Sequence, residues 1–217
     1  MRPILFHIFL ATILDLFPAL LSGQNNPRFG TQPKLAIGPV YIEATTEMIR
    51  GRNDRALELI QHILKDHPGH SASQHNIAKI YFHQQNLEEA ERYAQRAVET
   101  EPDNYWYSVQ LRDIYEQRGN FPAAIEVQEK IAAGAEANPR EAIQLSELYR
   151  RNRQDKKALS ALTDFESNKG NQPAFADFKL DLLIKLGKTN EALEPLSFLR
   201  QADPEYPKYY ELEYELL

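Results

Sequence analysis

The sequence contains no cysteine, only two methionines and a single tryptophan. The absence of cysteine excludes disulfide bonds, thiolate zinc sites, a cysteine nucleophile and a lipidated N-terminal cysteine. An excess of positive charge is also missing, because 25 Lys and Arg stand against 31 Asp and Glu, a formal charge of −6. Such a chain has no general attraction for phosphate backbones or anionic membranes, so we expect no nucleic-acid partner. The 42% hydrophobic content over 217 residues is enough for a sizeable core.

Sequence motifs of catalysis are missing too. There is no glycine-rich phosphate loop, no Gly-x-Ser-x-Gly turn and no His-Glu-x-x-His helix. Histidines gather between residues 62 and 83, and His75 and His83 would share a helix face, so a metal site is one interpretation. Lys79 would repel a cation there and no carboxylate completes the set, which favours ordinary polar residues. We therefore predict a protein that is not an enzyme and has no cofactor or metal.

The first 23 residues, MRPILFHIFLATILDLFPALLSG, have the layout of a secretory signal peptide. Arg2 precedes an apolar run, Pro18 breaks it, and the small residues Ser22 and Gly23 precede polar residues. A retained membrane anchor and a misread start are the alternatives. Residues 24–36, rich in Pro and polar residues, are expected to form a linker. We expect a cleaved leader and a periplasmic or secreted protein, with no membrane span after cleavage.

A period of 34 residues runs through the rest of the sequence. Alanine recurs at this interval, tyrosine recurs three times in a second column, and glycine and proline recur in two others. The members of these columns are Ala56, Ala90, Ala124, Ala158 and Ala192; Tyr81, Tyr115 and Tyr149; Gly51, Gly119 and Gly187; and Pro68, Pro102 and Pro204. Several independent columns in one frame indicate a repeat protein.

One unit, residues 71–104, shows the physics of the repeat. Ile77, Ala78 and Tyr81 have the apolar spacing of a first helix, and a short polar turn follows. Small alanines then mark one side of a second helix, where they allow two helices to approach closely. Pro102 ends that helix because proline cannot continue the backbone ladder. A hairpin with apolar surface on two sides must stack on its neighbours to be stable.

These columns strongly resemble the tetratricopeptide repeat family, through Ile77, Ala78, Tyr81, Ala90, Ala97, Pro102 and their equivalents. The resemblance implies an all-α, right-handed α-solenoid of five helix hairpins plus a C-terminal helix, with a concave inner groove. In this frame the units are 37–70, 71–104, 105–138, 139–172 and 173–206.

Some positions depart from the family pattern. Glu47 stands where Tyr is expected, which predicts a degenerate capping repeat, and Arg112 replaces a small residue. Proline arrives late, at Pro139 and Pro173, so either the turns before these residues are longer or the second helices run a turn further. Residues 207–217 form either a solvated cap or the start of a further repeat; their tyrosines and leucines favour a docking surface.

The resemblance implies that the first helix of each unit lines the concave groove. Charges of both signs alternate there around a few apolar side chains, which suits a peptide or a partner helix. The predicted groove residues are His75, Lys79, Phe82, His83, Trp106, Asp113, Glu116, Arg140, Glu147, Arg150, Arg151, Asp181 and Lys185.

Two groups in this set are open to two interpretations each. Trp106 either anchors a partner or packs between units. Arg140, Arg150 and Arg151 either bind a carboxylate of a partner, or are solvated or paired with Glu147. One subclass of the family grips a C-terminal carboxylate with a leading Lys and Asn, but Tyr41 and Thr45 hold those positions here.

We therefore predict a non-enzymatic protein–protein interaction scaffold exported to the cell envelope. The leader, the repeats and the segment LLSGQNN are similar to exported tetratricopeptide proteins of Bacteroidota-type bacteria. The alternative is an accessory subunit or an N-terminal fragment of a larger envelope enzyme or assembly complex. The tyrosine- and leucine-rich C-terminal helix is a second surface through which association is expected.

Overall fold

The computed structural model describes residues 36–134 and 138–217. The predicted leader at 1–23 and all but the last residue of the predicted linker at 24–36 lie outside these residues. Eleven α-helices and one 3₁₀ turn, without a strand, make up the part that is described. This confirms the all-α fold of five helix hairpins followed by a single C-terminal helix. Residues 37–217 form one compact unit.

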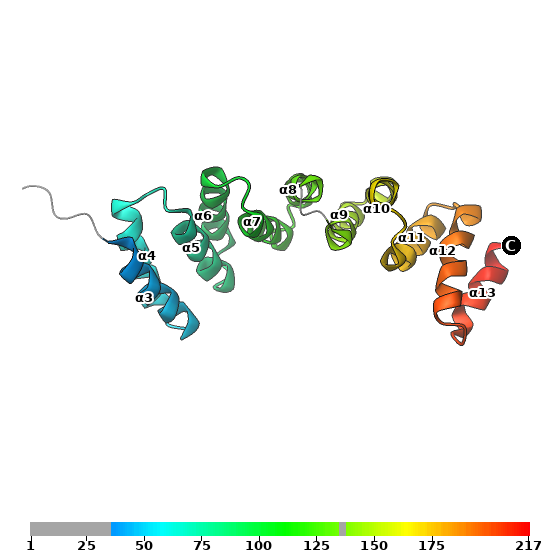
Figure 1. The fold of residues 1–217 in the computed structure, drawn as a ribbon, viewed down its shortest axis with the longest axis horizontal. Helices are drawn as coiled ribbons and strands as arrows, with labels where there is room; N and C mark the ends of the chain where they lie inside the picture. Colours follow the sequence, from blue (N-terminus) through cyan, green and yellow to red (C-terminus); the bar gives the residue numbers. More distant parts are fainter. Residues whose placement is uncertain (1–35, 135–137) are drawn as a thin grey trace, which may run out of the picture. The chain divides into compact units, whose positions relative to one another are not determined.

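The helices pair in chain order, and each hairpin contacts the next one along the chain (Figure 1). The first four pairs are α3 (Ile37–Ile49) with α4 (Asn53–Asp66), α5 (Ser71–His83) with α6 (Leu87–Thr100), α7 (Tyr105–Gln117) with α8 (Phe121–Ala133), and α9 (Pro139–Arg151) with α10 (Asp155–Lys169). A 3₁₀ turn, η1 (Pro173–Phe175), leads into α11 (Ala176–Lys185), which pairs with α12 (Thr189–Ala202), and α13 (Pro207–Leu216) follows.

The alanine column lies where paired helices cross. All five of its members, from Ala56 to Ala192, have no exposed surface. Because a methyl group takes little room, the helix backbones can approach closely there. The larger apolar residues of neighbouring hairpins, such as Ile77 and Ile114, fill the space on either side and are also fully buried. The core therefore runs from hairpin to hairpin.

The glycine column lies in the turn inside each hairpin, where the backbone takes a positive φ. Gly51, Gly119 and Gly187 have φ of 74°, 72° and 69°. The next residue donates its N–H to a carbonyl five residues earlier, as Asn120 does to Tyr115 at 2.9 Å, and so closes the first helix. Gln85 and Arg153 occupy the same turn position in the other two hairpins, with φ of 62° and 58°.

The positions that depart from the family pattern have structural explanations. Glu47 is buried and its carboxylate holds Arg50 at 3.1 Å and Arg52 at 2.7 Å. The late prolines begin elements: Pro139 is the first residue of α9 and Pro173 opens η1. The preceding second helices end at Ala133 and Lys169, so neither runs a full turn beyond its counterparts.

The C-terminal helix has two different faces. Tyr209, Leu212 and Leu216 pack against the core of the last hairpins. Tyr214 and Leu217 are 86% and 89% exposed. Arg200 of α12 forms an ion pair with Glu213 and fixes α13 to the hairpin before it. In the described part of the chain, every helix is too short or too polar to cross a bilayer.

The alanine contacts give a first prediction. Ala124→Leu adds three carbons at a fully buried crossing and should lower the free energy of unfolding by about 1–3 kcal/mol through overpacking. Ala202→Leu is the control, because Ala202 is exposed at the end of α12. Urea unfolding followed by circular dichroism measures both. Equal stability of the two variants would contradict the assigned crossing.

A second prediction concerns pH. Burial, and then a hydrogen bond donated to Glu129, raise the pKa of Tyr149 from its ordinary value near 10 to about 12. The neutral phenol therefore stabilises the folded state fully below pH 10, and this contribution is lost as the pH rises toward 12. We expect Tyr149→Phe to flatten the decline of unfolding free energy above pH 10, measured by urea unfolding. The exposed Tyr214→Phe should leave the decline unchanged; the same slope in both variants would refute this role.

Candidate functional site

Polar side chains connect the first helices of the third, fourth and fifth hairpins. Gln144 of α9 donates to Glu116 of α7 at 3.2 Å, and Arg151 of α9 forms an ion pair with the same carboxylate. Arg150 of α9 lies 3.9 Å from Asp181 of α11. Residues near the C-terminal ends of α7, α9 and α11 therefore face one another across successive hairpins.

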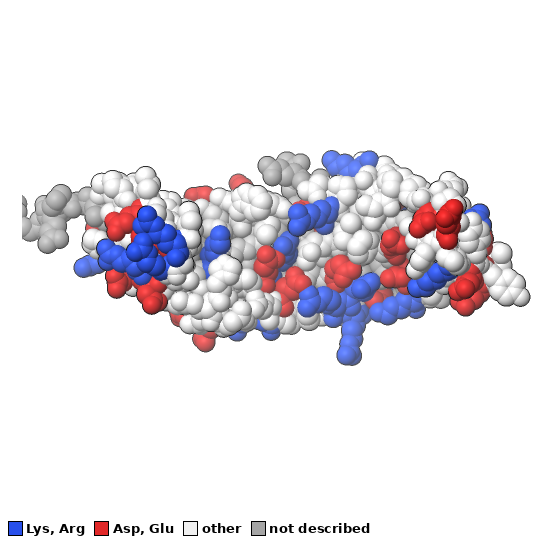
Figure 2. Space-filling model, turned by 90° about the horizontal axis from the view of Figure 1, so that it is seen from below, with Lys and Arg blue, Asp and Glu red and all other residues white. Residues whose placement is uncertain are grey.

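A hollow of about 480 Å³ opens between α9 and α11. Its lining residues are Arg150, Arg151, Asp181, Leu182 and Lys185. We call it the α9–α11 hollow. Four of the five are predicted groove residues, and the fifth, Leu182, is a buried core residue at the base of the hollow. Figure 2 shows Lys and Arg gathered over the α9–α11 part of the face in view, with Asp and Glu between them.

The cations of the hollow are neutralised to different degrees. Lys185 Nζ lies 2.7 Å from a carboxylate oxygen of Asp155, and Arg151 is held by Glu116. Arg150 is farther from its carboxylates, at 3.6 Å from Glu147 and 3.9 Å from Asp181. These two distances exceed those of charge-assisted hydrogen bonds, so the guanidinium of Arg150 keeps donors for a ligand.

The predicted groove residues of α5 have a different environment. The ring of His75 packs against that of Tyr107, with centroids 4.8 Å apart and ring planes tilted by 31°. Burial, and then the charge of Lys79, lower the pKa of His75, so its ring is neutral at pH 7. His83 is exposed and meets the edge of Phe82. No group of three or more His, Asp or Glu within the described ranges is placed to hold a metal ion.

Trp106 lies away from the α9–α11 hollow. It is 69% exposed near the N-terminus of α7 and meets Tyr105 edge to face at 5.0 Å. It lines another hollow with Lys130 and Ile131 of α8. Because Glu116 is ten residues further along α7, the two side chains are separated by about 15 Å of helix. The structure thus divides the predicted groove residues between the two ends of the first helices.

The remaining predicted residues occupy separate places. Asp113 is held by its neighbour Arg112 at 2.5 Å, and Lys79 and Arg140 are exposed to solvent. Glu147 is half-buried beside Arg150.

A buried polar network at the junction of α7, α8 and α9 was missed by the sequence analysis. The buried carboxylate of Glu141 accepts hydrogen bonds from Tyr105 at 2.7 Å and from Gln128 at 2.9 Å. Gln128 in turn accepts from Arg112 at 2.8 Å. The sequence does contain a signal for this network, because Gln128 occupies a repeat column that holds the apolar residues Ala94, Leu162 and Leu196 in other units. Satisfied in this way, the network joins the third hairpin to the fourth.

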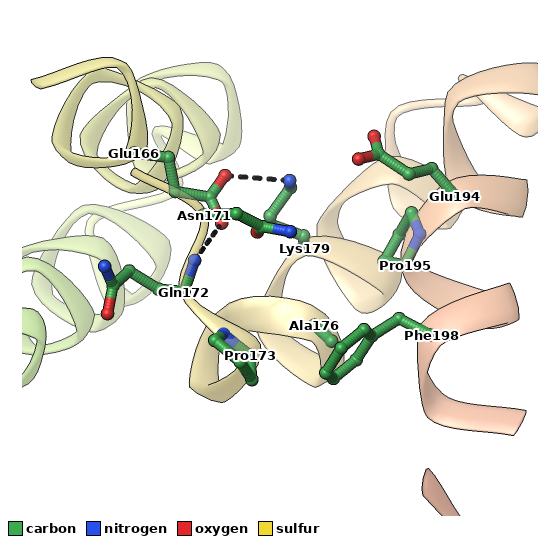
Figure 3. Close-up of a pocket in the computed structure, with 9 residues that line it drawn as sticks. All are labelled: Glu166, Asn171, Gln172, Pro173, Ala176, Lys179, Glu194, Pro195 and Phe198. Atoms are coloured by element: carbon green, nitrogen blue, oxygen red, sulfur yellow. Dashed lines mark hydrogen bonds and ion pairs between the residues drawn. The ribbon is translucent and has the colours of Figure 1, made fainter. Parts of the chain in front are cut away.

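A smaller hollow lies between α10, η1, α11 and α12 (Figure 3). Within it, Lys179 pairs with Glu166 at 2.9 Å, and the backbone N–H of Gln172 donates to the same carboxylate at 3.1 Å. Its volume is about 20 Å³, which is room for a single water. This hollow is a junction between hairpins and has no room for a peptide.

Comparison with known proteins agrees with this architecture. Residues 47–112 match the family model described as tetratricopeptide repeat. A search of curated proteins gives no significant match.

Three similar solved structures illustrate the fold. The crystal structure of MamA protein superposes with a TM-score of 0.64 at 16% identity, covering 80% of this chain and 94% of that one. YrrB, described as a tetratricopeptide protein with an unusual peptide-binding site, superposes with a TM-score of 0.63 at 13% identity. The match covers 82% of this chain and 92% of YrrB. PilF of Pseudomonas aeruginosa superposes with a TM-score of 0.55 at 17% identity, and the match covers 83% of this chain and 82% of PilF. Residues 47–112 therefore carry the tetratricopeptide repeat match, and the described helices as a whole share the fold of these structures.

Proposed function

We propose that this chain is an exported, non-enzymatic scaffold that holds a peptide or a partner helix against its first helices. The observation that carries this proposal is the α9–α11 hollow, which combines an incompletely paired Arg150, a paired Lys185 and the exposed carboxylate of Asp181. Such a surface offers a ligand charges of both signs, which can fix its register and orientation. YrrB, which is described as having an unusual peptide-binding site, shares the fold and supports this choice.

The binding site can be tested with two variants. Arg150→Glu with Arg151→Glu reverses two charges of the hollow and should reduce partner capture from an envelope extract at least tenfold. Trp106→Ala, at the other end of α7, is a separate variant. Circular dichroism would establish that both are folded. Loss of partner capture with the arginine variant alone would assign binding to the hollow. Loss of capture with Trp106→Ala alone would assign binding to the other end of α7.

A crosslinking experiment makes the assignment direct. A photo-crosslinking residue at position 185, on the rim of the hollow, should capture the partner. The same residue at position 126, an exposed site on the second helix α8, should not. Capture at 126 and not at 185 would refute the proposed site. A partner retained by every variant would place binding on the exposed face of α13.

The proposed export gives its own prediction. Cleavage after Gly23 would leave Gln24 as the first residue of the mature protein. Intact-mass measurement of the chain recovered from the periplasmic or secreted fraction should show this shortened form. A chain that retains residues 1–23 in a membrane fraction would identify the segment as an anchor, and an uncleaved chain in the cytoplasm would refute export.

A further inference from the structure

The turn between α9 and α10 concentrates positive charge. Residues 150–157, RRNRQDKK, hold five basic side chains and one acidic one, in a chain whose formal charge is −6. Arg150 and Arg151 line the α9–α11 hollow. Asp155 begins α10 and is bound to Lys185, which also lines the hollow. Arg153 lies between these points in the sequence, so its turn is flanked by Arg151, which lines the hollow, and by Asp155, which is paired with a lining residue.

Arg153 occupies an unfavourable backbone position. Its φ is 58°, in the left-handed region that favours glycine, and three of the five equivalent turns have glycine there. A side chain with a Cβ is strained at this φ, and such strain often lies at functional sites. In the described structure the guanidinium of Arg153 has neither a hydrogen bond nor an ion pair to compensate for the strain.

Two acidic residues around the turn are closely paired with other cations. Glu116 is paired with Arg151, and Asp155 with Lys185. Glu147 and Asp181 lie at 3.6 and 3.9 Å from Arg150. Lys156, in the first turn of α10, has no ion pair in the described part of the chain and is exposed. Arg153 and Lys156, which have no counter-charge in the described part of the chain, therefore follow the loosely paired Arg150 in the sequence. We call these three residues the cationic rim.

We propose that the cationic rim, made of Arg150, Arg153 and Lys156, binds acidic side chains of the peptide held in the α9–α11 hollow. The inference rests on the proposed function and names its ligand class: a peptide rich in Asp or Glu. Carboxylates between the cations, and the negative charge of the whole chain, oppose a polyanionic backbone and favour separate carboxylates. Arginine is suited to this role because its planar fork binds a carboxylate at two points.

The strained backbone allows a test that separates binding from folding. Arg153→Gly removes the charge and relieves the strain, so its melting temperature should equal or exceed that of the natural chain. Gln85→Gly is the matched control, because Gln85 holds the same turn position in the second hairpin with φ of 62°. Arg153→Lys retains the charge and should retain most of the binding.

The probe is a short labelled peptide of alternating glutamate and alanine, compared with the same peptide containing glutamine. Fluorescence anisotropy on the full chain should show that the glutamate peptide binds more tightly, and that added salt weakens it. Arg153→Gly should weaken this binding about three- to tenfold, while Gln85→Gly leaves it unchanged.

Three outcomes would overturn the proposal: equal binding of the two peptides, equal effects of the two glycine variants, or tighter binding of a single-stranded oligonucleotide. If the acidic peptide fails while the partner still crosslinks at position 185, the hollow remains the binding site and only the ligand class is wrong. If crosslinking at position 185 also fails, the proposed function fails with it.

Discussion

The close approach of paired helices determines where every side chain of the first helices lies. A fully buried alanine at each crossing brings the two backbones together, and the larger residues of the next hairpin pack beside that contact. Because the crossing repeats with the period of the sequence, residues about one period apart become neighbours. Arg151 meets Glu116, Asn76 donates to Tyr41, and Tyr105 donates to Glu141. The surface available to a partner is therefore a consequence of core packing.

The junction between the third and fourth hairpins is also held by buried hydrogen bonds between polar side chains. Gln128 and Arg112 replace residues that are small or apolar elsewhere, and Glu141 is buried beside Gln128. A buried carboxylate is unfavourable unless its hydrogen bonds are satisfied, and here Tyr105 and Gln128 satisfy them. A fourth hairpin shifted by one helical turn would leave Glu141 without donors. The network therefore selects one register for the hairpins that carry the α9–α11 hollow.

The fold could be predicted from the sequence because the residues that specify each hairpin lie close together in the chain and recur in every repeat. Five alanines in one column, and glycines in the turn column, report a crossing and a left-handed turn that each hairpin needs. The site could be predicted only in part. Repeat position indicates which residues lie on the first helices, and four of them do line one hollow. Repeat position does not indicate which cations are neutralised, since Lys185 finds Asp155 on another helix whereas Arg150 remains loosely paired.

Residues that break a repeat column thus carry information of two kinds. Gln128 breaks its column and finds partners inside the protein, so its departure is explained by packing. Arg153 also breaks a column, because glycine suits the left-handed turn better, yet its side chain meets no partner in the described structure. Gln85 breaks the same column but accepts a hydrogen bond from Gln117 at 2.7 Å, which ties two hairpins together. Of the two non-glycine residues at this turn, only Arg153 incurs strain without a compensating contact, and it does so in the turn between α9 and α10. That contrast separates Gln85, whose contact lies within the fold, from Arg153, for which we propose a partner on another molecule.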